Sequence, residues 1–141
     1  MSGASWLVVD ASAVADAVLR PDGVGDVVRT VLATSICHAP HLIDAELGSV
    51  VRRLVLRGDL RSELAAARLG QAQRLVDVRH EMGGHLSEAA WRLRNEITFY
   101  DARYVALAIG LERPLLTSDG RLAAAARSHC EVLLLTGDGV T

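Results

Sequence analysis

The feature that most constrains the fold is a short apolar run near the start of the chain that ends on an acidic residue. Residues 6–9 (WLVV) are uncharged and include two β-branched side chains, which is typical of a strand buried on both faces. Asp10 follows directly, and Ser12 stands where a helix cap is expected. Open α/β sheets place functional groups at the carboxyl ends of their strands, so Asp10 is the first candidate site residue.

Downstream, apolar strand patterns alternate with helical ones, which predicts a parallel sheet covered on both faces by helices. The predicted strands are 6–9, 36–39, 75–78, 114–117 and 132–135, and the predicted helices are 13–19, 22–33, 41–56, 60–73, 86–96, one that opens at 98–101, and 121–128. We therefore expect one three-layer α/β/α domain over 1–141, with a central sheet of about four to five strands. Its core is expected at about 6–135, with 136–141 as a loose tail.

Composition excludes several classes of protein. No apolar run approaches the roughly 18 residues that a membrane span requires, and the first ten residues lack the basic and apolar segments of a signal peptide. Cys37 and Cys130 are too few and too far apart to indicate a disulfide framework or a zinc site. These observations favour a cytoplasmic protein without a membrane partner.

The charged residues are unusual because every basic side chain is an arginine and lysine is absent. The net charge of −2 argues against nucleic-acid binding through bulk attraction, although the planar guanidinium suits phosphate contacts. Genomic base composition is the simpler explanation for the missing lysine. Its absence nevertheless excludes mechanisms that need a catalytic lysine.

Four acidic residues fall at junctions that such a sheet would bring together: Asp10, Glu46, Asp101 and Asp119. Each has a simpler explanation. Asp10 and Asp119 could cap helices, Asp101 could form a capping box with Thr98, and Glu46 lies on the border of an apolar helix stripe. The simple explanations weaken when the four are considered together, because like charges in one cleft repel by about 4 kcal/mol per pair at 4 Å and an effective dielectric of 20.

Such a cluster must take up protons or hold a cation. Ligands that are all oxygen atoms suit Mg²⁺ or Mn²⁺ rather than zinc. A divalent cation with open positions can bind a phosphodiester oxygen and lower the pKa of a bound water. The acidic set therefore predicts phosphodiester hydrolysis.

Other assignments fit less well. His80 and His85 are five residues apart with two glycines between them, whereas the zinc-protease motif needs histidines four apart on a helix. Receiver domains and aspartyl phosphatases both use a lysine, and the phosphatases expect a second aspartate where this chain has Ser12. A non-catalytic module that binds RNA or sequesters a partner remains as the alternative.

Four segments together resemble the PIN domain, and within it the VapC-type toxins of prokaryotic toxin–antitoxin pairs. They are residues 8–12 (VVDAS), 40–46 (PHLIDAE), 97–108 (ITFYDARYVALA) and 115–122 (LLTSDGRL), of which the last two are the more specific. The resemblance extends from residue 7 to about 135.

The resemblance implies a Mg²⁺- or Mn²⁺-dependent endoribonuclease that inhibits translation. It makes the acidic set catalytic, with Asp10 and Asp101 as direct metal ligands and with Glu46 and Asp119 binding directly or through water. It gives Ser12 and Thr117 supporting polar roles.

The resemblance also implies a homodimer and a cognate VapB-type antitoxin that brings an arginine into the groove. Arg52, Arg53, Arg57 and Arg61 could contact RNA or antitoxin, and the sequence does not choose between them; exposed helix surface is the simplest reading of each. The aromatic residues Phe99, Tyr100 and Tyr104 are expected to pack against the sheet, with base stacking as the alternative. Asp44 is expected at the surface.

Overall fold

The centre of the fold is the strand β1 (Ser5–Val9), whose last three residues are buried, in a computed structural model that describes residues 3–141. The six strands lie in the order β3-β2-β1-β4-β5-β6. All neighbours are parallel except β5 and β6. The other strands are β2 (Ser35–Pro40), β3 (Val78–His80), β4 (Leu115–Thr117), β5 (Val132–Thr136) and β6 (Gly139–Val140).

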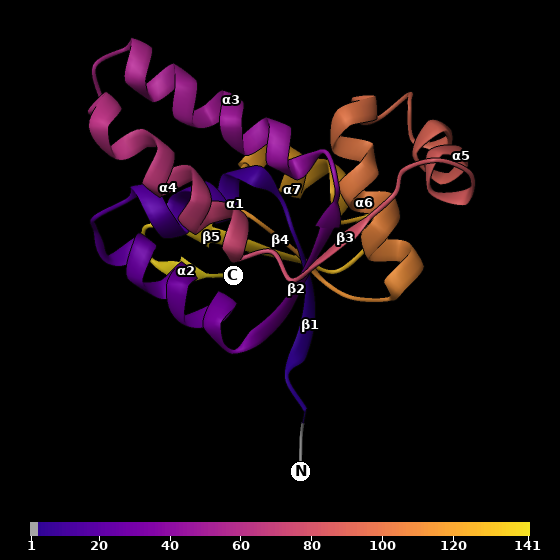
Figure 1. The fold of residues 1–141 in the computed structure, drawn as a ribbon. Helices are drawn as coiled ribbons and strands as arrows, with labels where there is room; N and C mark the ends of the chain where they lie inside the picture. Colours follow the sequence, from indigo (N-terminus) through magenta and orange to yellow (C-terminus); the bar gives the residue numbers. More distant parts are fainter. Residues whose placement is uncertain (1–2) are drawn as a thin grey trace.

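Helices cover the sheet in two layers, so the predicted three-layer α/β/α fold is confirmed (Figure 1). The first layer consists of α1 (Ala11–Leu19), α2 (Gly23–Ala33), α3 (Ile43–Leu56) and α4 (Ser62–Arg74). The second consists of α5 (His85–Arg92), α6 (Phe99–Leu111) and α7 (Gly120–Ala126). This division follows from the strand order, because right-handed crossovers that move in opposite directions along a sheet place their helices on opposite faces.

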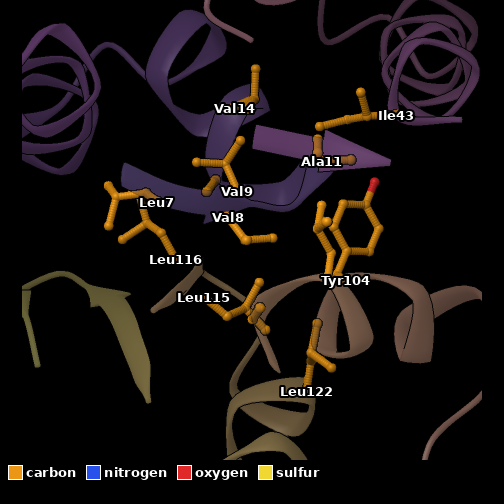
Figure 2. Close-up of a cluster of buried hydrophobic side chains, with 14 of the residues drawn as sticks. Leu7, Val8, Val9, Ala11, Val14, Ile43, Tyr104, Leu115, Leu116 and Leu122 are labelled. Carbon is orange, nitrogen blue, oxygen red and sulfur yellow. The ribbon is translucent and has the colours of Figure 1, made fainter. Parts of the chain in front are cut away.

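The core lies where the sheet meets these layers. Val8 and Val9 of β1 and Leu115 and Leu116 of β4 are fully buried, and Tyr104 of α6 packs beside them with its ring directed toward Ala11 and Ile43 (Figure 2). Parallel strands buried on both faces explain why these runs are continuously apolar rather than alternating.

The direction of the chain reverses between β1 and β4. From β1 the chain proceeds to β2 and β3 on one side, and from β4 to β5 and β6 on the other. Open sheets bind ligands at such a switch point, outside the carboxyl ends of the strands. Asp10 follows β1 and Asp119 follows β4, so both acids lie at this point.

The predicted loose tail is wrong. Gly139 and Val140 pair antiparallel with Thr136 and Leu135, which gives the sheet six strands instead of the four to five expected. The intervening Gly137 and Asp138 form a two-residue connection, a loop length and composition that favour β-hairpins.

Two other boundaries also differ from the predicted ones. The third strand begins at Val78 rather than Leu75, because the chain is still leaving α4 at Leu75 and its ladder with β2 starts only three residues later. The predicted helix 86–96 ends at Arg92 and continues as turns. Neither change moves a candidate site residue.

Candidate active site

Asp10 is the most buried acid of the site, with 5% of its surface exposed. One carboxylate oxygen accepts hydrogen bonds from the Ala13 amide (3.0 Å) and the Ser12 hydroxyl (2.7 Å), and the other accepts one from the Thr117 hydroxyl. Burial outweighs these hydrogen bonds and raises the pKa of Asp10 to about 6, and the nearby charge of Asp119 adds to the increase. Asp10 is therefore a helix cap and a perturbed acid at the same time.

The two hydroxyls predicted to support the site do contact Asp10, and they also connect it to the end of β4. Besides its bond to Asp10, Ser12 accepts a hydrogen bond from the Ser118 amide (3.1 Å), and Thr117 accepts one from the Asp119 amide (3.0 Å). This network fixes the carboxylate of Asp10 relative to the turn that carries Asp119.

Asp119 caps α7, since one oxygen of its side chain accepts hydrogen bonds from the amides of Arg121 (2.9 Å) and Leu122 (3.2 Å). Capping by an aspartate at a helix N-terminus is also favourable electrostatically. Asp119 nevertheless lines the same cleft as Asp10. Both residues therefore cap helices and also line the cleft, and their roles in the site stay predictions.

Asp101 lies in the first turn of α6, and the Thr98 hydroxyl accepts a hydrogen bond from its amide (3.3 Å). Partial burial and the charge of Asp119 raise the pKa of Asp101, against the lowering effects of Thr98 and Arg103. Because Asp119 acts on both Asp10 and Asp101, the three carboxylates share one electrostatic environment.

Glu46 reaches the cleft from α3 and is held by two donors from α6. Its Oε1 atom accepts hydrogen bonds from Arg103 Nη2 (2.9 Å) and from the Tyr104 hydroxyl (3.0 Å). Burial and the negative charge of Glu46 raise the pKa of Tyr104, which keeps this phenol protonated as a donor.

All four predicted acids line a single cleft of about 680 Å³. Arg53 and Tyr100 also line it. Of the four arginines considered from the sequence, only Arg53 is part of this lining, and Arg57 instead pairs with Asp59 at 2.9 Å. Tyr100 is 66% exposed, so its expected packing against the sheet is wrong.

Phe99 and Asp44 are also found away from the core. Phe99 is 42% exposed, against the expectation that it packs. Asp44 is partly exposed and forms an ion pair with Arg79 at 2.6 Å, outside the residues that line the cleft.

The donor set fits a hard divalent cation. It contains only carboxylate and hydroxyl oxygens, the chemistry that Mg²⁺ and Mn²⁺ prefer. Burial is the main cause of the raised pKa values of Asp10 and Asp101, and the charge of Asp119 adds to both. Among residues 3–141, no group of three or more His, Cys, Asp or Glu side chains is close enough to form a ready ligand set. The assignment of Asp10 and Asp101 as the two direct ligands stays a prediction.

The sequence did not reveal Arg103 and gave no site role to the Tyr104 hydroxyl. Arg103 is 1% exposed and lies on α6 just before a run of buried residues from Tyr104 to Ala108. A single arginine among buried alanines, valines and leucines was the available signal, because a charged group in such a place needs a partner.

A family model described as the PIN domain matches residues 7–128. The chain is 48% identical to Ribonuclease VapC1 of Mycobacterium tuberculosis over 128 residues, which are 91% of this chain and 96% of that protein. It is 37% identical to VapC ribonuclease Mb0985 of Mycobacterium bovis, with coverage of 92% and 98%. The chain therefore belongs to the PIN domain family, and within it to the VapC-type ribonucleases.

Solved structures share the fold. The crystal structure of PAE2754 from Pyrobaculum aerophilum aligns with a TM-score of 0.65 at 24% identity, covering 92% of this chain and 90% of that one. VapBC2 from Rickettsia felis, bound to a promoter DNA fragment, aligns with a TM-score of 0.65 at 14% identity, with coverage of 90% and 96%.

Within the described residues, none of the helices has the length and apolar character needed to span a membrane.

Proposed function

We propose that this chain is a divalent-cation-dependent endoribonuclease that hydrolyses RNA phosphodiester bonds in the acidic cleft. One observation carries the proposal: carboxylates from four separate parts of the chain line one cleft at the switch point of the sheet. A cleft that brings carboxylates together, with the pKa values of Asp10 and Asp101 raised, is typical of a functional site.

In this proposal Asp10 and Asp101 hold Mg²⁺ or Mn²⁺, and Glu46 and Asp119 complete the site directly or through water. When bound, such a cation supplies electrostatic stabilisation of a phosphoryl oxygen and lowers the pKa of a bound water. Ser12 and Thr117 keep the Asp10 carboxylate in a fixed orientation through their hydrogen bonds. A fixed carboxylate needs less rearrangement when the cation and substrate arrive.

The mouth of the cleft supplies groups suited to an RNA strand. Arg53 is exposed on α3 and can contact a phosphate, and the exposed ring of Tyr100 offers a surface on which a base can stack. Both lie on the lining that also contains the acids, so one strand could contact them while its backbone crosses the carboxylates.

We further propose a toxin role: cleavage inhibits translation in the cytoplasm, and a cognate VapB-type antitoxin neutralises the protein, which forms a homodimer. Support comes from the VapC-type relatives and from the structural neighbour that was solved as a VapBC complex. Induced expression should arrest growth, and co-expression of a neighbouring small open reading frame should restore it. Normal growth despite abundant folded protein would argue against the toxin role.

The test of the activity is RNA cleavage by the purified protein with Mg²⁺ or Mn²⁺ and with excess chelator. We expect cleavage with the cation, none with chelator, and none from Asp101→Asn. Asp44→Asn is the matched control, because Asp44 is an aspartate outside the cleft lining. A non-catalytic RNA-binding module would instead bind RNA without cutting it, whether or not the cation is present. Mapping RNA 5′ ends in cells after induction would identify the substrate.

A further inference from the structure

The least expected group near the cleft is the guanidinium of Arg103. The Arg103 side chain is 2% exposed, and the residues that follow it on α6, Tyr104 to Ala108, are all buried. Its Nη2 atom donates to Glu46, its Nε atom donates to the Tyr100 carbonyl (3.2 Å), and its guanidinium lies 4.8 Å from the centre of the Tyr100 ring.

This arrangement is poorly explained by stability alone. The Nη1 atom of Arg103 is buried and has no hydrogen-bond partner among the described residues. A buried charge with an unsatisfied donor is costly, and replacing a buried ion pair with apolar side chains is often neutral or stabilising. An apolar residue at position 103 would suit its neighbours better, so the contact with Glu46 is the more informative feature.

Only one of the two carboxylate oxygens of Glu46 is held by hydrogen bonds from the described residues. Both donors, Arg103 and Tyr104, bind Oε1 of Glu46, and no hydrogen bond from residues 3–141 reaches Oε2. Because the Glu46 side chain is 30% exposed and lines the cleft, the carboxylate is held by one oxygen while the other stays free. The guanidinium also places one fixed positive charge beside Glu46, and this charge counteracts the rise in the pKa of Asp101.

Resting on the proposed function, we propose that Arg103 is a positioning residue that holds Glu46 through Oε1 and acts as the internal counter-charge of the acidic cleft. It limits the affinity of the site for a divalent cation and keeps Glu46 in place when that cation binds. Its effect follows from charge as well as from geometry, and this distinguishes it from Tyr104, which contacts the same oxygen without a charge.

The experiment measures Mn²⁺ affinity by calorimetry without RNA, beside kcat at saturating Mn²⁺. For Arg103→Met we expect Mn²⁺ to bind about tenfold more tightly, because a nearby positive charge is lost, while kcat falls because Glu46 is no longer held. Arg103→Lys keeps the charge and should restore Mn²⁺ affinity to within about twofold of the wild type. Tyr104→Phe is the neutral control and should also leave this affinity within about twofold.

Unchanged Mn²⁺ affinity in a folded Arg103→Met protein would overturn the proposal. If that variant does not fold, NMR of the wild type provides the test. When Mg²⁺ is added, the signal of Arg103 Nε–H should shift and should stay protected from hydrogen exchange. A signal that does not shift would contradict the proposal. Absence of Mn²⁺ binding by the wild type would instead refute the proposed metal site itself.

Discussion

The cleft has two walls that treat negative charge differently. On the wall formed by the strand ends, Asp10 is surrounded by neutral donors, namely two hydroxyls and an amide, and its pKa rises to about 6. On the helix wall, Glu46 is paired with the guanidinium of Arg103. Neutral hydrogen bonds orient a carboxylate without cancelling its charge, whereas an ion pair does both.

The difference assigns distinct tasks to Asp10 and Glu46. Within residues 3–141, Asp10 is fixed in place by neutral donors alone, which suits a direct ligand for a cation. Glu46 is already partly neutralised by Arg103, which suits a group that completes the cation site through water. The predictions below test this contrast.

The largest effect is expected on cleavage by Asp10→Asn. Loss of a direct ligand should lower the cleavage rate by at least about 10³-fold, since electrostatic stabilisation by a bound cation is worth several kcal/mol. Single-turnover cleavage of a labelled RNA measures it. If Glu46→Gln proved more damaging than Asp10→Asn, the proposed division between the walls would be wrong.

The same substitution should make the protein more stable near neutral pH. Burial raises the pKa of Asp10 from 3.8 to about 6, so the native state binds the proton more tightly than the unfolded state. Stability is therefore lost as the pH rises from about 4 to about 6, by about 3 kcal/mol in total. Asparagine avoids this cost and still caps a helix.

Urea unfolding without divalent cations at about pH 7.5 and about pH 4 provides the measurement. Asp10→Asn should gain up to about 3 kcal/mol at the higher pH and almost nothing at the lower one, where wild-type Asp10 is protonated. The control variant Asp44→Asn, which loses an ion pair outside the cleft, should show no gain in stability at the higher pH. Equal gains at both pH values would contradict the assigned pKa shift.

Cation affinity should also depend on pH. Because protons compete with the cation for Asp10, Mn²⁺ affinity should fall by about tenfold per pH unit below about 6. Calorimetric titrations between about pH 7.5 and about pH 5 would show this. An affinity that is constant across this range would mean that Asp10 does not bind the cation.

A smaller effect is expected at Arg53. Arg53→Ala should raise KM for RNA about threefold, because one phosphate contact is lost. For the same reason, the slope of log RNA affinity against log salt concentration should become shallower by about 0.7. Arg52→Ala is the matched control, because Arg52 is the exposed neighbour on the same helix and does not line the cleft. Equal effects of the two substitutions would remove Arg53 from the proposed RNA path.

The two walls also differ in how far the sequence could predict them. Asp10, Ser12, Thr117 and Asp119 lie at the carboxyl ends of apolar strands or just after them, and strand order alone brings such positions together. The Glu46–Arg103 pair joins side chains 57 residues apart, from α3 in one helical layer and α6 in the other. Periodicity places each residue on its helix but does not fix which side chains meet between the two layers.

The errors elsewhere have local causes. Two glycines in 136–141 predict a loose end, but the pair Gly137–Asp138 forms the tight turn of a hairpin. Tyr100 and Tyr104 are both aromatic residues of α6, yet one lines the cleft and the other is buried. They lie four residues apart on one face of the helix, so their different burial follows from position along the axis, with Tyr100 in the first turn and Tyr104 one turn further on.

The most direct test of the central claim is the Mn²⁺ affinity of the wild type beside that of the double variant Asp10→Asn/Asp101→Asn, measured by calorimetry without RNA. The proposal predicts saturable binding by the wild type and a loss of at least about 100-fold in the variant, because two of the charged oxygen ligands are removed. Equal affinity in a folded double variant would show that these carboxylates do not form the cation site.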